Sequence, residues 1–153
     1  MYDTKRDILD ALSGMPEVLG RVVADLMAGG HALAAPPGAW SAVEIVCHLR
    51  DAEERALERT RIMLVADTPK ITPYDPAAWA IERQYASQEL RAALLAFGAL
   101  RETHTAELEA IPFQDWHRGG EHQEYGHIDI LGHALHIMSH DAVHLRQLAR
   151  LVG

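Results

Sequence analysis

Apolar residues recur along the first part of this chain at alternating spacings of three and four, which is the period of an amphipathic α-helix. The first stripe of this kind consists of Ile8, Leu12, Met15, Leu19, Val22 and Leu26. Pro16 lies inside the stripe, so we expect either a kinked helix or two short helices separated near Gly14. Glycines and adjacent prolines in residues 29–40 then predict a loop.

The same period continues in three later segments. Ser41 and Glu44 have the spacing of a capping box and open a second helix. Its apolar stripe is Ile45, Leu49, Ala52, Ala56, Thr60 and Met63, and residues 67–76, which contain three prolines, end it. We expect a third helix from Pro76 or Ser87 to Ala110, a loop at 111–126, and a last helix from about Ile128 to Leu151.

Strand signals are nearly absent, because β-branched residues are scattered and alanine and leucine dominate. Four long helices joined by loops of moderate length predict an all-α fold, an up-down-type four-helix bundle. The 153 residues contain no internal repeat or linker, so we expect a single domain over 1–153.

Composition excludes several classes of partner. A net charge of -8 argues against nucleic acid, whose phosphates need a basic face. No apolar run approaches the roughly 18 residues of a membrane span, and the first residues do not form a signal peptide. The single cysteine, Cys47, permits no internal disulfide and indicates a cytoplasmic protein, with Cys47 expected in the core.

Histidine is the exception to this ordinary composition, since eight of the ten histidines follow residue 103. His133, His136, His140 and His144 leave the last predicted helix within an arc of about 80°. Buried unpaired imidazoles cost free energy, and charged ones repel each other, whereas a metal cation satisfies neutral ring nitrogens. Two histidines four residues apart are a common helical half-site, so His140 and His144 are candidate ligands.

The third candidate ligand is His48, which borders the apolar stripe of the second helix. Three histidines from two helices would leave coordination positions for water or a small-molecule substrate. We expect His136 and His133 to support the ligands or to line a cavity. The alternatives are an incidentally stacked His140 and His144 and an ordinary core histidine at position 48.

The remaining histidines have simpler interpretations. His104 lies on the apolar stripe of the third helix and is expected to be structural. Solvated side chains are expected for the four histidines in or beside loops, His31, His117, His122 and His127. A di-iron site is disfavoured because neither the second nor the last helix contains Glu-x-x-His.

Two segments, "PPGAWSAVEIVCHLRDAEE" (36–54) and "HALHIMSHDAVHLRQLARL" (133–151), together resemble the DinB/YfiT-like superfamily of four-helix metalloproteins. The resemblance rests on a Trp-Ser helix start, a histidine in the second helix and a terminal H-x-x-x-H, at Trp40, Ser41, Glu44, His48, His140, His144 and Gln147. It implies a divalent metal such as nickel or zinc, held by His48, His140 and His144, often within a homodimer.

The resemblance also implies a class of reaction, because related members include S-transferases and isomerases that use low-molecular-weight thiols such as mycothiol or bacillithiol. An open metal position can stabilise a thiolate at neutral pH. We therefore expect a metal-dependent thiol S-transferase acting on a small electrophile. Two alternatives stay open: a metal-dependent hydrolase that activates water, and a non-catalytic metal-binding or stress-response interaction bundle.

Charged residues near the ligands have more than one interpretation. Asp141 occupies the position at which HExxH zinc proteases carry a glutamate, so it is a candidate base. We favour instead a role in orienting an imidazole ring. A plain surface charge is the third alternative. Glu44 could accept a hydrogen bond from His48, although the capping box alone explains it. Arg50, Arg55, Arg59 and Arg61 could hold carboxylates of a thiol cofactor. A solvated face paired with neighbouring acidic residues is favoured.

Overall fold

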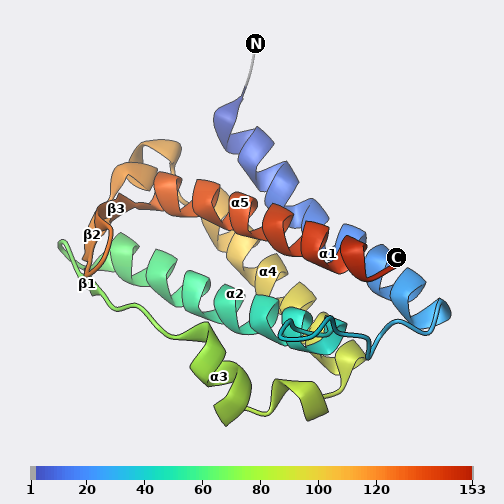
Figure 1. The fold of residues 1–153 in the computed structure, drawn as a ribbon. Coiled ribbons are helices and arrows are strands. Elements are labelled where there is room, and N and C mark those ends of the chain that lie inside the picture. Colours follow the sequence, from blue (N-terminus) through green and yellow to red (C-terminus); the bar gives the residue numbers. More distant parts are fainter. Residues whose placement is uncertain (1–2, 153) are drawn as a thin grey trace.

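Four long helices pack into a bundle in this computed structural model, which describes residues 3–152 (Figure 1). They are α1 (Thr4–Ala28), α2 (Ala42–Val65), α4 (Leu90–Ala110) and α5 (Ile130–Ala149). The predicted all-α four-helix bundle is therefore confirmed. Within residues 3–152, none of these helices combines the length and apolar character that crossing a membrane requires.

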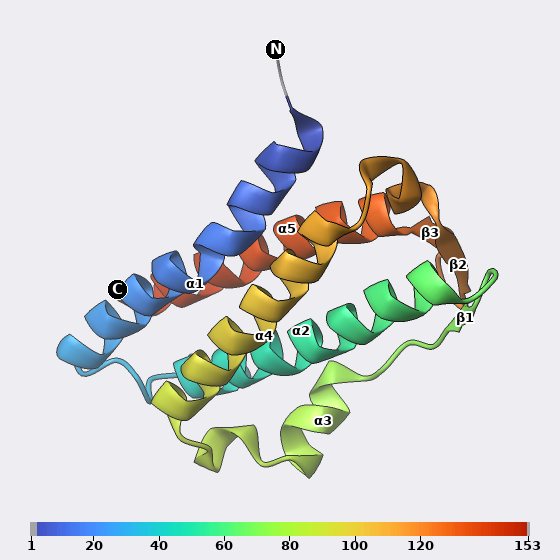
Figure 2. The same ribbon diagram turned by 180° about the vertical axis from the view of Figure 1, so that it is seen from behind.

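The helix directions do not simply alternate along the chain. Helix α2 packs between α4 and α5, and α1 contacts the same two helices from the other side. Contacts between α2 and α4 advance together along both helices, from the Glu53–His104 pair to the Arg61–Glu107 pair, so these helices are parallel. Figure 2 shows the same relation, and α1 and α5 also run in one direction.

The segment between α2 and α4 makes this arrangement possible. It contains β1 (Lys70–Ile71), the short helix α3 (Pro76–Glu82) and a 3₁₀ turn at Tyr85–Ser87, and it returns along the bundle to the end where α2 began (Figure 1). Of the two predicted starts of the third helix, Pro76 begins the separate helix α3, and the long helix begins three residues after Ser87 and ends at Ala110 as predicted. Helix α4 begins at Leu90, where the Glu89 carboxylate accepts hydrogen bonds from the next free amide groups.

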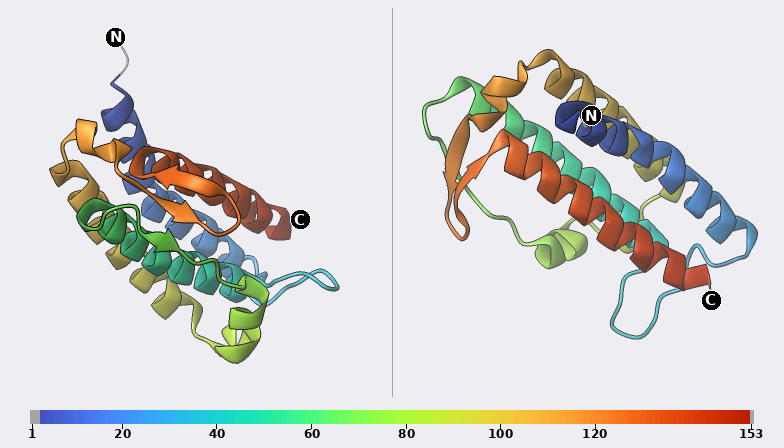
Figure 3. Two further views of the ribbon diagram at one scale, coloured as in Figure 1. Left: turned by 90° about the vertical axis from the view of Figure 1, so that its left-hand side faces the viewer. Right: turned by 90° about the horizontal axis from the view of Figure 1, so that it is seen from above.

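The prediction that residues 111–126 form a loop without strands is wrong. A 3₁₀ helix at Phe113–His117 leads into β2 (Gly119–His122), which pairs with β3 (Gly126–Asp129) and with β1 at one end of the bundle (Figure 3). A Cβ on Gly119 would lie 2.3 Å from the Ile128 carbonyl oxygen, and one on Gly120 would lie 2.6 Å from that of Pro69. These glycines allow close backbone pairing, although in the sequence they resemble loop residues.

Helix α1 continues through Pro16 without the predicted break. Proline has no N–H, so the carbonyl of Leu12 lacks its usual partner four residues later. The Arg101 guanidinium donates a 3.0 Å hydrogen bond to this carbonyl oxygen and replaces the missing interaction.

Arg101 is also the centre of a buried ionic network. Its side chain is 2% exposed, donates to both oxygens of Asp141 on α5 at 2.7 and 2.9 Å, and lies 3.0 Å from Glu53 on α2. Glu53 accepts a second hydrogen bond from His104, whose other ring nitrogen contacts Thr60. One guanidinium on α4 therefore contacts the other three helices of the bundle.

Apolar side chains fill the space on both sides of this network. One cluster surrounds Leu19, Ile45 and Phe97, and the other surrounds Leu9, Met63 and Ile130. Cys47 is buried in the first cluster, as its position in the sequence predicts.

Replacing Arg101 should destabilise the fold strongly. Arg101→Met would leave the Glu53 and Asp141 carboxylates buried without a cation, which costs about 3–5 kcal/mol. Urea unfolding followed by circular dichroism measures this loss. The matched control is Arg61→Met, which removes an exposed ion pair with Glu107 and should cost far less stability than Arg101→Met. Equal losses in the two variants would contradict a central role for Arg101.

Candidate metal centre

The antiparallel contact of α2 with α5 brings the candidate ligands together. The Nε2 atom of His133 donates to the Ala56 carbonyl oxygen at 3.1 Å and thereby sets the register of the two helices. His48 precedes Ala56 by about two turns, and His140 follows His133 by two turns, so the two imidazoles face each other. His144 extends the same face of α5 by one further turn.

The three Nε2 atoms converge on one point. Those of His48 and His140 are 2.9 Å apart, those of His140 and His144 are 3.1 Å apart, and the ligand atoms of all three residues lie within 4.8 Å of one another. Metal–nitrogen bonds of 2.0–2.1 Å place neighbouring ligand atoms about 2.9 Å apart in octahedral and about 3.4 Å apart in tetrahedral geometry. The donor set therefore fits a divalent cation bound on one side.

Burial keeps these imidazoles uncharged at neutral pH. Burial, together with the nearby charge of His144, lowers the pKa of His48 to about 4 and that of His140 to about 3. Burial also lowers the pKa of His144. Since a neutral imidazole has a lone pair to donate, the folded chain presents three nitrogens ready for coordination.

Neighbouring groups orient two of the rings. Nδ1 of His144 lies 2.8 Å from the amide oxygen of Gln147, so the imidazole N–H donates there and the lone pair of Nε2 faces the centre. The ring of Trp40 lies 5.2 Å from that of His48. Nδ1 of His48 is buried and has no hydrogen-bond partner among residues 3–152.

Glu44 does not fill the role of a partner for His48. Its carboxylate accepts hydrogen bonds from the backbone N–H and the hydroxyl of Ser41, at 3.1 and 3.0 Å, in the capping box that begins α2. The requirements of the helix start therefore account for this residue.

Asp141 also differs from its expected roles. Both carboxylate oxygens accept hydrogen bonds from Arg101, and the residue is buried, so it is not a surface charge. No hydrogen bond joins it to an imidazole in the described part of the chain. The favoured role in orienting a ligand and the alternative role as a base both give way to a structural ion pair, because Asp141 projects toward α4 rather than toward α2.

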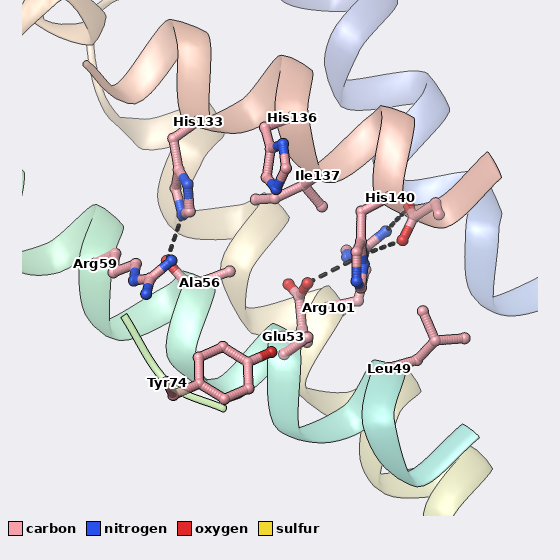
Figure 4. Close-up of a pocket in the computed structure, with 12 residues that line it drawn as sticks. Leu49, Glu53, Ala56, Arg59, Tyr74, Arg101, His133, His136, Ile137 and His140 are labelled. Atoms are coloured by element: carbon pink, nitrogen blue, oxygen red, sulfur yellow. Dashed lines mark hydrogen bonds and ion pairs between the residues drawn. The ribbon is translucent and has the colours of Figure 1, made fainter. Parts of the chain in front are cut away.

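A narrow cavity of about 80 Å³ opens beside His140, between α2 and α5 (Figure 4). His133 and His136 line it, in agreement with one of their two expected roles. His133 is buried and bonded to the backbone of α2, whereas His136 is exposed and its ring lies 6.3 Å from that of His140. Tyr74, from the segment before α3, faces them across the cavity.

The other histidines follow the sequence-based expectations with one exception. His104 is structural and joins Glu53 to Thr60. His122 is buried instead of solvated, because its Nδ1 accepts hydrogen bonds from the backbone N–H groups that follow it in the hairpin. The Arg101 network was not predicted, although charged residues on the apolar stripe of α4 were a usable signal.

Comparison with known proteins agrees with this geometry. A family model of the DinB superfamily matches residues 3–148. The chain belongs to the DinB superfamily. Within this DinB-superfamily chain, all three converging histidines fall inside the matched region.

Two relatives of this DinB-superfamily chain are both named "Putative metal-dependent hydrolase". The protein YfiT of Bacillus subtilis is 28% identical over 120 residues, which cover 76% of this chain and 67% of YfiT. The protein of Geobacillus kaustophilus is 29% identical over 110 residues, which cover 71% of this chain and 61% of the relative. The matched region thus spans about two thirds or less of each relative.

A solved structure of the same YfiT relative has the fold of this DinB-superfamily chain. YfiT from Bacillus subtilis, described as having "an unusual four-helix bundle topology", superposes with a TM-score of 0.88 and 23% identity. The match covers 96% of this chain and 85% of YfiT. At this level of identity the likeness shows a shared fold.

The buried histidines should make the metal-free protein sensitive to mild acid. His48, His133 and His140 have folded-state pKa values of about 3–4, below the ordinary 6.5. At a pH between these values the unfolded chain therefore binds more protons than the folded chain does. Stability therefore falls as the pH drops from about 6.5 to about 4, by up to about 2 kcal/mol per histidine between pH 7 and pH 5. Urea midpoints of chelator-treated protein at these two pH values measure the loss.

His133→Gln tests this prediction at one residue, since its amide can still donate to the Ala56 carbonyl but does not titrate. The variant should lose less stability than the unsubstituted protein between pH 7 and pH 5. His117→Gln, at an exposed position, should leave the difference unchanged. A midpoint that does not move in this range for the unsubstituted protein would contradict the buried neutral histidines.

Proposed function

We propose that His48, His140 and His144 hold one divalent cation, with nickel or zinc favoured, and that the protein is a metal-dependent enzyme. The convergence of three neutral Nε2 atoms is the observation that carries this proposal. The names of the two relatives support metal dependence. A non-catalytic metal-binding bundle is the outcome expected if metal binds without turnover.

The reaction we favour is transfer of a small electrophile to a thiol. A divalent cation at the three histidines supplies Lewis acidity that stabilises an anionic nucleophile. The carboxylates of Glu53 and Asp141, which line the cavity, are both paired with Arg101 and cannot serve as free bases. This environment suits a thiol, which has a pKa of about 8.5 and loses its proton far more readily than water does.

We assign the proton transfer to His136. It lines the cavity, is exposed, and lies beside His140. In the proposed reaction its imidazole accepts the S–H proton, the sulfur lone pair attacks the electrophilic carbon, and the leaving group departs with its bonding electrons. The proton on His136 then passes to the leaving group or to solvent.

Hydrolysis is the second candidate, and the relatives' names favour it. A cation held by the same three histidines would lower the pKa of a water molecule, and His136 would again accept the proton. The two candidates differ in the nucleophile, so product analysis with and without added thiol separates them.

Metal content tests the assigned ligands. Purified protein should contain close to one divalent metal per chain, and His140→Ala should lose it because only two ligands remain. Inductively coupled plasma mass spectrometry measures the ratio. His117→Ala, which changes an exposed histidine far from the triad in sequence, should keep the metal. Equal metal content in both variants would contradict the assigned ligands.

Turnover with a thiol and an electrophile tests the proposed reaction. Metal-loaded protein should accelerate the reaction of a low-molecular-weight thiol with monochlorobimane, and a chelator should abolish the rate. His136→Gln should reduce kcat about 100-fold while metal content stays unchanged, because only proton transfer is removed. If esters or amides are cleaved and no thiol adduct forms, the hydrolase is the correct function. Bound metal without either activity would establish the non-catalytic bundle.

A further inference from the structure

Arg59 differs from the other arginines of α2 because no carboxylate within residues 3–152 forms an ion pair with it. The others form ion pairs within the chain: Arg50 with Asp51, Arg55 with Glu58 and Arg61 with Glu107. Arg59 donates to the carbonyl oxygen of Thr72 at 2.9 Å, and its Nε is buried without a hydrogen-bond partner among residues 3–152. In a chain with net charge -8, this half-buried cation is available for an external anion.

Arg59 lies where two cavities meet. The narrow cavity beside His140 shares Arg59, His133 and His136 with a larger cavity of about 470 Å³. The larger cavity lies against the β2–β3 hairpin and is bounded by Tyr125 and other hairpin residues. Figure 4 shows Arg59 reaching from α2 toward His133, at the end of the narrow cavity away from His140. A ligand in the larger cavity can therefore extend past Arg59 toward the candidate metal centre.

The surroundings of Arg59 favour an anion. The two carboxylates that line the narrow cavity, Glu53 and Asp141, are both paired with Arg101 and not with Arg59. The ring of Tyr74 lies 6.0 Å from the Arg59 guanidinium and forms an aromatic wall beside it. Burial lowers the pKa of Arg59, and the nearby charge of Arg55 lowers it further. A bound anion would offset both effects, because it stabilises the charged guanidinium.

We propose that Arg59 binds a carboxylate of the small molecule that reacts at the metal centre, an inference that rests on the proposed function. Arg59 follows His48 by three helical turns, about 16 Å along the axis, and helical side chains lean back toward the N-terminal end. The carboxylate therefore lies about 10 Å from the reacting atom, a separation that a molecule the size of a tripeptide can span. The remainder of such a ligand fits the larger cavity, whose volume is typical of small-molecule sites.

Glutathione is a suitable probe, since it is a tripeptide thiol with a carboxylate at each end, and its diethyl ester is the comparison in which both carboxylates are masked. Isothermal titration of metal-loaded protein should show at least 10-fold tighter binding of the acid than of the ester. Arg59→Gln should remove this preference without changing metal content, and Arg59→Lys should retain part of it. Arg61→Gln removes the same charge from the same helix and should keep the full preference.

A second arm separates this proposal from the metal-dependent function. S-methylglutathione, which has no free thiol, should bind chelator-treated protein more tightly than its own diethyl ester, and Arg59→Gln should abolish the difference. This result would support the carboxylate site even if the protein proved to bind no metal. Equal binding of acid and ester by the unsubstituted protein in either arm, or the same loss in Arg61→Gln as in Arg59→Gln, would overturn it.

Discussion

The guanidinium of Arg101 is the interaction on which the arrangement of the helices depends. From α4 it reaches Glu53 on α2, Asp141 on α5 and the Leu12 carbonyl on α1, so every helix of the bundle is bonded to one buried group. Burying these charges costs free energy, and an apolar core could be equally stable. The network makes the packing directional, because a planar guanidinium donates hydrogen bonds only to partners in fixed positions. Those positions hold α2 against α5 in a single register, together with the hydrogen bond from His133 to Ala56.

The candidate metal centre is a consequence of this register. Asp141 follows His140 directly in α5, and Glu53 lies between one and two turns beyond His48 in α2, so the helices that Arg101 ties together are the ones that supply the ligands. The ligands stand on rigid helices, and burial keeps them neutral, which leaves their lone pairs free before any cation arrives. One side of the triad, at His140, adjoins the narrow cavity between α2 and α5. The geometry is thus organised for coordination by the fold itself.

Much of the site was predictable because helical periodicity acts over short distances. A spacing of four placed His140 and His144 on one face of α5, and the apolar stripe of α2 placed His48 at the edge of the bundle. The parallel course of α2 and α4 was not predictable, because periodicity shows which face is buried but not which helix covers it. The predicted roles of Asp141 and Glu44 were not found for a similar reason. Their carboxylates accept hydrogen bonds from Arg101 and Ser41 instead of from an imidazole. The hairpin was missed because its strands depend on glycines that pair closely with distant backbone.

The proposed centre requires imidazoles from two helices to share one cation, and X-ray absorption spectroscopy of zinc-loaded protein tests this most directly. The spectrum should require three imidazole nitrogens at about 2.0–2.1 Å from the metal, with the remaining positions filled by oxygen donors. His48→Ala should reduce the imidazole count to two or abolish binding. A spectrum fitted by fewer than three imidazoles in the unsubstituted protein, or one that His48→Ala leaves unchanged, would contradict the proposed centre.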